Sequence, residues 1–161
     1  MYEPKRKRML MMKYLIHLLF ALSFSFASVY DVGEIVSTTH QNITKSTCYA
    51  GNDYEVNDSW KLADWNGAIN GGHYTVIFIE MSATWWPSCY TGLQGPAGEV
   101  HQNFEDNDYV KFLGALADLN QPYSCAQWGN TPDGGYSQIV HDTNSGIYNL
   151  FGNGYVPMTV W

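Results

Sequence analysis

The sequence predicts a single α/β domain in which helices pack on a sheet that contains a parallel pair of strands. Two apolar runs, YTVIFIEM at 74–81 and YVKFLGALAD at 109–118, are typical of buried strands, and a helix-forming segment at 87–105 lies between them. Strand, helix and strand in this order form a crossover connection, as in parallel sheets. A length of 161 residues and a hydrophobic content of 45% suit one domain with its own core.

The first 27 residues predict a secretory signal peptide. Residues 5–8 are all basic, residues 14–26 are apolar but shorter than a membrane span, and Ser25-Phe26-Ala27 offers small residues to signal peptidase. We expect cleavage after Ala27 and export to the periplasm or the extracellular space, without stable membrane insertion afterwards. An uncleaved membrane anchor is the alternative interpretation.

The predicted mature chain, residues 28–161, is strongly acidic. It contains three lysines (Lys45, Lys61 and Lys111) and no arginine against fourteen Asp and Glu residues, which gives a net charge of −11. Such a surface repels phosphate backbones, so nucleic acid is excluded as a partner.

An N-terminal extension is predicted at 28–70. The segment is polar and rich in turns, with strand-like pieces at 29–36 and 46–50 and a short helix at 59–69.

The main domain is predicted at 71–161. After the strand at 74–81, the helix at 87–105 starts at Pro87, which suits a first helical turn, and is kinked or broken near Pro96. The remaining elements are a strand at 109–118, a loop at 120–137, a short helix at 142–151 and a strand at 155–161. That last strand has no later partner, so we expect either a truncated gene product or an exposed edge strand.

The stretch ATWWPSC, residues 83–89, follows the first buried strand. A dithiol oxidoreductase needs a thiol at a helix N-terminus, where the helix dipole stabilises the thiolate, and a second thiol one turn later that resolves a mixed disulfide. Cys89 occupies the second position, but Trp86 occupies the first. Because a tryptophan cannot attack a disulfide, the usual two-cysteine cycle is impossible within this motif.

Residues 74–161 resemble the thioredoxin-like superfamily, especially its exported redoxin and cytochrome-maturation branches. The likeness rests on YTVIFIEMSATWWPSC, which follows the family pattern of a buried strand and A-[ST]-W-C-P-x-C, and on GYVPMT, which resembles the family's G-[IV]-P-T segment. The resemblance implies a three-layer thioredoxin-like fold, and residues 28–70 are similar to the extension of exported members. We expect the final strand and helix of that fold to be missing, as in a fragment.

The resemblance also implies roles for individual residues. Cys89 would be the resolving thiol, Trp86 marks the position of the nucleophile, and Glu80 would accept the proton of the resolving thiol, since a carboxyl group in an apolar strand can hold a proton near neutrality. Pro157 would follow a cis peptide bond and form the substrate-binding wall. Trp85 and the backbone of Val156 would contact a substrate strand, and no cofactor is implied.

The expected partners are the thiols and disulfides of exported proteins and a protein reductant. The expected activity is thiol–disulfide exchange, impaired by Trp86; the alternative is a non-catalytic module that binds extended peptides along Val156-Pro157. Trp86 itself has three explanations: a real loss, a base error, or a recoded selenocysteine, because the Trp codon TGG is one base from TGT, TGC and TGA.

The cysteine pairing stays open at this point. Cys48 and Cys125 could form a structural disulfide, Cys89 and Cys125 could form a different redox pair, or a thiol could stay free, since three cysteines cannot all pair within one chain. The histidines are scattered, so no metal site is expected. A peroxidase is disfavoured because the residues before Cys89 do not fit its pattern.

Overall fold

The computed structural model describes residues 28–92, 96–119, 122–130 and 138–160. The predicted signal peptide at 1–27 and Trp161 lie outside the described residues. A six-stranded sheet has the order β2-β1-β5-β4-β3-β6. Its strands are β1 (Lys45–Tyr49), β2 (Ser59–Trp60), β3 (Val76–Ala83), β4 (Val110–Ala117), β5 (Ile139–His141) and β6 (Met158–Val160).

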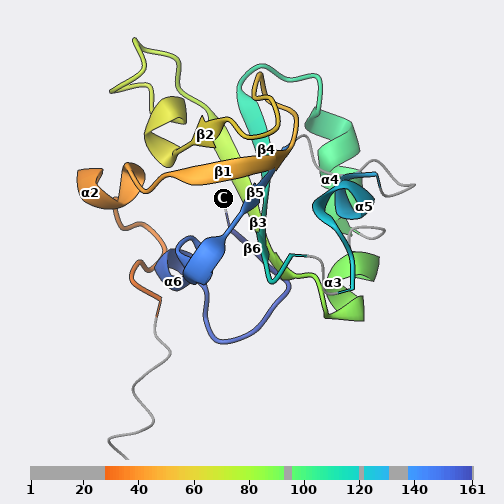
Figure 1. The fold of residues 1–161 in the computed structure, drawn as a ribbon. Helices are drawn as coiled ribbons and strands as arrows, with labels where there is room; N and C mark the ends of the chain where they lie inside the picture. The colour runs from red at the N-terminus through yellow and green to blue at the C-terminus, as the bar shows by residue number, and fades with distance from the viewer. Residues whose placement is uncertain (1–27, 93–95, 120–121, 131–137, 161) are drawn as a thin grey trace, which may run out of the picture.

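Helices cover both faces of this sheet, which makes a three-layer α/β structure (Figure 1). One face carries α3 (Pro87–Gly92), α4 (Pro96–Phe104) and α5 (Cys125–Gly129). The other carries α2 (Thr38–Gln41) and α6 (Tyr148–Phe151), with the 3-10 helices Leu62–Trp65 and Thr143–Ser145. The face with α3, α4 and α5 is called the thiol face below, because Cys89 lies there.

The predicted parallel pair is present. β3 and β4 run parallel over their full lengths, from Val76 opposite Val110 to Ala83 opposite Ala117. β5 is parallel to β4, whereas β6 is antiparallel to β3. Because the two long strands end together, the residues that follow Ala83 and Ala117 are brought to one edge of the sheet.

The predicted helix at 87–105 is broken as expected, into α3 and α4, with Pro96 at the start of the second piece. The strand-like piece at 46–50 corresponds to β1, which joins the sheet by pairing with β5. The extension and the main domain therefore share one sheet.

Several local predictions were wrong. Residues 29–36 form no strand, and α2 follows them with Ser37 as its N-cap. The predicted loop at 120–137 contains α5, which Ser124 and Gln127 cap reciprocally. The helix at 142–151 is split in two, since Asn144 has a left-handed φ of 58°. β5 was not predicted, because three residues are too few for a periodic pattern to be detected.

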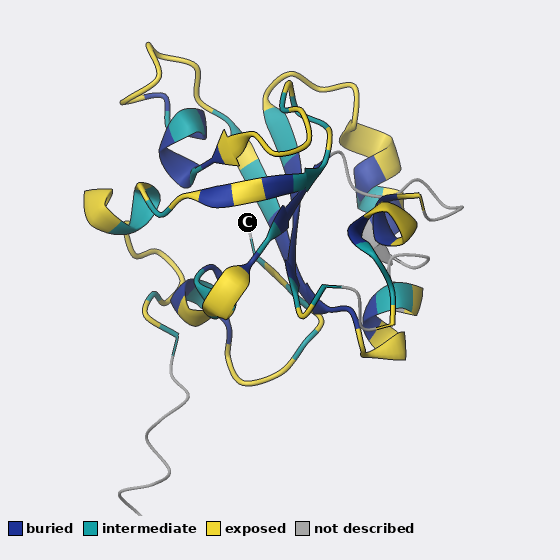
Figure 2. Cartoon of the chain, viewed as in Figure 1, coloured by how far each residue is buried: buried dark blue, intermediate teal, exposed yellow. Residues whose placement is uncertain are grey.

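The core consists of two clusters, one on each face. The larger contains Trp60, Trp65, Ile79, Leu113 and Ile147, and the smaller contains Cys89, Leu116, Cys125, Trp128 and Ile139. Figure 2 shows the buried positions concentrated along the central strands. The first half of β3 was expected to be buried on both faces, but Val76 is exposed and Ile77 and Phe78 are half-buried.

Candidate functional site

The motif ATWWPSC forms the turn between β3 and α3. The Trp86 N–H donates to the carbonyl of Ala83 (3.1 Å), and the Cys89 N–H donates to the carbonyl of Trp86 (3.0 Å). The Thr84 hydroxyl donates to the carbonyl of Asp118, just past the end of β4. These bonds fix residue 86 at the N-terminal end of α3, where Pro87 needs no backbone donor.

Two tryptophan side chains at this end of α3 are exposed to solvent. Trp85 is 51% exposed and Trp86 is 44% exposed, and their rings meet edge to face at 5.7 Å. The Trp85 indole N–H donates to a carboxylate oxygen of Asp118 (3.1 Å). By contrast, Trp60, Trp65 and Trp128 are buried in the core. Position 86, at the start of α3, therefore carries an exposed aromatic ring.

Cys89 lies on the inner side of α3 and is completely buried. Burial raises the pKa of its thiol, and the nearby Glu80 carboxylate also raises it; hydrogen bonds with the Ala83 backbone and the Ser82 side chain act in the opposite direction. The Ser82 hydroxyl donates to Glu80 Oε1 (3.2 Å), and both residues are buried. Cys89, Ser82 and Glu80 thus form a continuous polar path inside the thiol face.

A disulfide joins Cys48 of β1 to Cys125 at the start of α5, with a Cα–Cα distance of 6.0 Å. Of the pairings left open by the sequence, this is the one in the structure, and Cys89 is the free thiol. The disulfide cysteines pack in the same apolar cluster as Cys89. The rings of Tyr90 and Tyr123 stack in this cluster, and both meet Trp128 edge to face.

The loop before β6 contains the cis peptide bond Val156-Pro157. The Gly154 N–H donates to the phenol oxygen of Tyr148 (2.9 Å), so a side chain of α6 holds this loop in place. α6 is anchored in turn by Asp142, whose carboxylate accepts the N–H groups of Ile147 (2.8 Å) and Tyr148 (3.0 Å). Asp142 also forms a buried ion pair with Lys45 of β1 at 2.8 Å.

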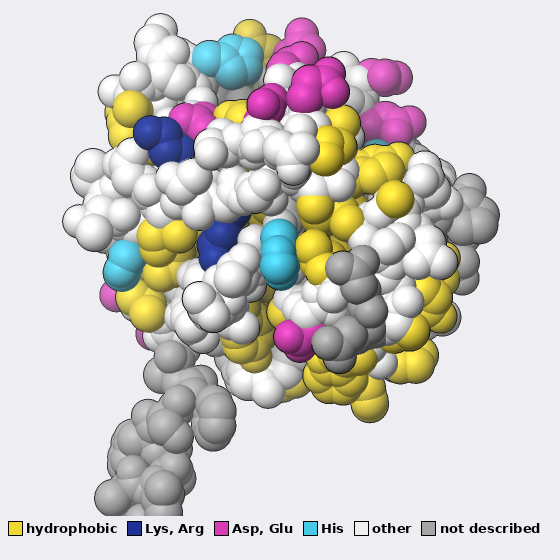
Figure 3. Space-filling view, in the orientation of Figure 1, with side chains coloured by type: hydrophobic (Ala, Val, Ile, Leu, Met, Phe, Trp, Pro, Cys, Tyr) yellow, Lys and Arg dark blue, Asp and Glu magenta, His cyan; other side chains and the backbone are white. Residues whose placement is uncertain are grey.

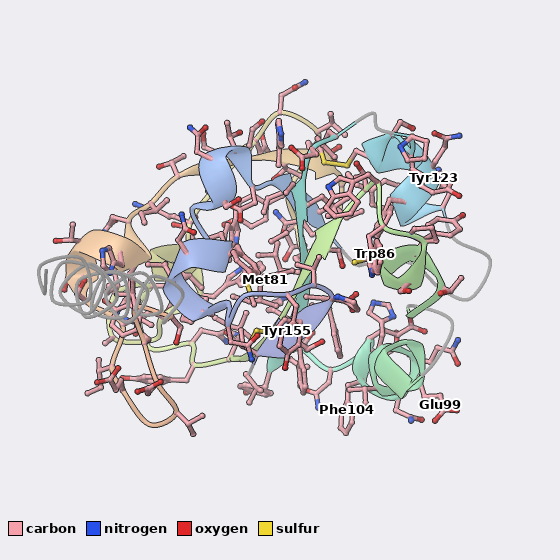
Figure 4. All side chains as sticks on the ribbon, turned by 90° about the horizontal axis from the view of Figure 1, so that it is seen from below. Met81, Trp86, Glu99, Phe104, Tyr123 and Tyr155 are labelled. Atoms are coloured by element: carbon pink, nitrogen blue, oxygen red, sulfur yellow. A yellow bond between two sulfur atoms is a disulfide. The ribbon has the colours of Figure 1, made fainter. Side chains whose placement is uncertain are left out.

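A cavity of about 420 Å³ lies between the motif and this loop, and we call it the loop cavity. Its lining comes from the ends of β3 and β4, the turn before α3, the segment from Asp142 into α6, and the loop before Pro157. The lining residues are Met81, Ser82, Ala83, Trp85, Trp86, Ala115, Ala117, Asp118, Asp142, Ser145, Tyr148, Gly154, Tyr155 and Val156. Figure 4 labels Met81, Trp86 and Tyr155, which come from three of these elements.

The structure brings together most of the residues singled out in the sequence. Trp85, Trp86 and Val156 line the loop cavity, and Cys89 and Glu80 lie on the thiol face next to it. Cys48 and Cys125 lie further along that face.

Sequence reasoning missed Asp118, Tyr148 and Ser82. Asp118 follows β4 directly, so the rule that parallel strands end at one edge would have found it. The role of the Tyr148 phenol depends on a loop conformation that no local pattern encodes.

In the described ranges, no three His, Cys, Asp or Glu side chains converge in a way that could hold a metal ion. None of the helices in those ranges is long and apolar enough to cross a membrane.

No protein-family model matches the chain, and no curated protein matches it. The chain is similar to the solved structure of MTB DsbF in its mixed oxidized and reduced forms, with a TM-score of 0.52 and 16% sequence identity over 76% of this chain and 77% of that chain. A likeness at this level of identity concerns the fold. The chain therefore has a thioredoxin-like α/β fold.

Proposed function

We propose that the protein is built around a thioredoxin-type thiol–disulfide site that acts on exported proteins. The observation that carries the proposal is the buried path from Cys89 through Ser82 to Glu80 beneath the start of α3, beside the loop whose Val156 packs against the cluster of Cys89. A resolving thiol needs a proton acceptor within reach, and a substrate segment needs a wall with free backbone groups. The position of Glu80 supports the first role, and the position of the loop at 154–157 supports the second.

Each residue has a definite role in the proposed exchange. A thiolate at position 86 would attack a substrate disulfide, form a mixed disulfide and release one substrate thiolate, which takes up a proton. Cys89 would then lose its proton to Glu80 through the Ser82 hydroxyl and attack the sulfur at position 86. The second substrate thiolate leaves, and an 86–89 disulfide remains for an external dithiol to reduce. Trp86 blocks the first step, since an indole has no thiolate.

The gain-of-function variant Trp86→Cys tests this proposal. We expect it to form an 86–89 disulfide on oxidation and to reduce insulin in the presence of a dithiol donor. The matched control, Trp85→Cys, places a thiol one residue too early and should reduce insulin no faster than the donor alone. If a folded Trp86→Cys protein is as inactive as this control, the site lacks the proposed geometry.

Glu80 is tested in the same background. In Trp86→Cys, the change Glu80→Gln should slow the resolving step about tenfold or more, because it removes the proton acceptor, and mixed disulfides should accumulate. The first attack should keep its rate, since it does not involve Glu80. Mass spectrometry of quenched reactions separates the two steps.

A non-catalytic peptide-binding module is the second candidate. It is favoured by the natural chain having an exposed ring at position 86 above a thiol that is fully buried. In this case the natural protein binds extended cysteine-containing peptides along Val156-Pro157 but does not turn over insulin. Turnover by the natural protein, with no variant introduced, would exclude the module.

The gene itself also has to be read again at codon 86. TGT or TGC there would make the protein an ordinary dithiol oxidoreductase, and TGA would point to selenocysteine, which mass spectrometry detects. A confirmed TGG would leave the peptide-binding module as the activity of the natural chain.

A further inference from the structure

We propose that the loop cavity binds a lysine or arginine side chain next to the cysteine of the docked peptide. This inference rests on the proposed function, because it names the class of segment that the cis-proline loop receives. It follows from the aromatic mouth of the cavity, its uncompensated carboxylate and its apolar floor.

Three aromatic side chains form the mouth. Trp85, Trp86 and Tyr155 all line the cavity, and Tyr155 is 67% exposed. Trp85 is held in place by its hydrogen bond to Asp118 and its edge-to-face contact with Trp86. The faces of such rings attract cations, and tryptophan does so most strongly. Exposed rings grouped around one opening are also typical of surfaces that another molecule covers.

Asp118 supplies the charge. The lining includes two acidic residues and no Lys, Arg or His. Asp142 is neutralised by Lys45 at 2.8 Å. In the described part of the chain no ion pair involves Asp118: Lys61 bonds to Asn42, and Lys111 lies near the start of β4, roughly 20 Å from its end at 3.3 Å per residue. The cavity therefore presents one negative charge to an incoming side chain.

The volume and the apolar lining of the cavity suit a long aliphatic stem. Met81, Ala115 and Ala117 form apolar surface inside it, and its volume of about 420 Å³ fits one extended side chain. Lys and Arg bury their methylene groups on apolar surface and keep the charged group near polar partners. Here the stem would lie over Met81, with the charged group between Asp118 and the rings.

Charge on the rest of the molecule favours the same partner. The predicted mature chain has a net charge of −11, and Figure 3 shows acidic side chains gathered at one end of the face drawn there, with few basic ones. A basic segment would be attracted from a distance and then held at the cavity.

The test measures binding of three fluorescent peptides by anisotropy at low salt. The peptides are identical around a central S-methylcysteine, except that the neighbouring residue is lysine, norleucine or glutamate. We expect the protein to bind the lysine peptide about fivefold more tightly than the norleucine peptide, and the glutamate peptide most weakly.

Asp118→Asn should reduce the preference for lysine to about twofold. Asparagine tolerates the left-handed φ of 54° at this position, and its amide oxygen can still accept the Trp85 N–H, so the fold is kept. Asp106→Asn is the matched control, because it removes an exposed carboxylate at the opposite end of β4 and should leave the preference unchanged. The preference should also weaken as salt is raised.

Three results would overturn the inference. Equal binding of the three peptides would show that the cavity does not distinguish the charge of the neighbouring residue, although the peptides do bind. A preference that survives Asp118→Asn would place the recognition elsewhere. A complete lack of binding by all peptides would instead remove the docking proposed for Val156-Pro157, and the inference with it.

Discussion

The two faces of β3 differ in almost every respect, although one strand supplies both. Glu80 and Ser82 interact with Cys89 on the thiol face, whereas Met81 and Ala83 alternate with them and line the loop cavity, whose lining Ser82 also reaches. The thiol face is closed, since its cysteine has no exposed surface. The cavity is open and has aromatic rings at its mouth. Under the proposed function, recognition and sulfur chemistry can therefore be changed separately, except at positions 82 and 86, which border both.

The two faces of the sheet are also stabilised by different interactions, and β1 contributes to both. Lys45 of this strand forms the buried ion pair with Asp142 on the cavity side, and Cys48 forms the disulfide with Cys125 on the thiol face. The positions are three residues apart, so an extended strand directs them to opposite sides. The extension at 28–70 thus stabilises the site on both faces, and each fastening can be removed by itself.

Removing the disulfide should have the largest effect. Cys48 and Cys125 are separated by 77 residues, and closing a loop of that length stabilises the folded state by roughly 4 kcal/mol through the unfolded chain. Urea unfolding with and without a phosphine reductant should differ by about this amount. The double variant Cys48→Ala/Cys125→Ala should unfold at the lower stability and ignore the reductant. An unchanged midpoint for the reduced protein would contradict this.

Removing the charge of Lys45 should come second. Lys45→Met leaves the Asp142 carboxylate buried without its cation, at a cost of about 3 kcal/mol in unfolding free energy. Because Asp142 anchors α6 and the cavity loop, peptide affinity should fall, while alkylation of Cys89 in the folded state should not change. Lys61→Met is the control, since the ammonium group of this half-buried lysine bonds to the side-chain oxygen of Asn42, which carries no charge. Adding Asp142→Asn to Lys45→Met should recover part of the loss.

The pH dependence of the thiol face should be the smallest effect. The pKa of Cys89 is raised in the folded state, so the thiol form is favoured there and its contribution to stability is complete below the unfolded value of about 8.5. As pH rises through the higher folded value, that contribution is lost. Urea midpoints of the natural protein should fall more steeply above pH 8.5 than those of Cys89→Ala. Parallel slopes would mean that Cys89 does not titrate with folding.

The sequence predicted the long elements of the fold. β3, β4 and the break between α3 and α4 were all readable, because long apolar runs and prolines act locally. β5 and α5 were missed, since they are short and are held by sheet pairing and by the disulfide rather than by periodicity.

Some features of the candidate site could be predicted from the sequence and others could not. The motif at 83–89, Pro157 and the three cysteines could be identified from the sequence alone. The pairing of the cysteines could not. The buried position of Lys45 could not be predicted, because lysine is almost always exposed and its partner is distant in sequence. The peptide roles of Val156 and the signal peptide at 1–27 stay predictions.

The position of the Tyr148 ring against the loop before Pro157 determines which substitutions this loop tolerates during evolution. A side chain at Gly152 would lie 2.5 Å from the Tyr148 ring, so position 152 is restricted to glycine while that ring stays in place. Tyr155 and Asn153 are exposed and carry no such restriction. The loop thus separates residues that hold its shape from residues that are exposed to solvent. If peptides dock here as proposed, mutation at 153 and 155 would alter which peptides bind without altering the loop, and a library randomised at these two positions would measure that freedom directly.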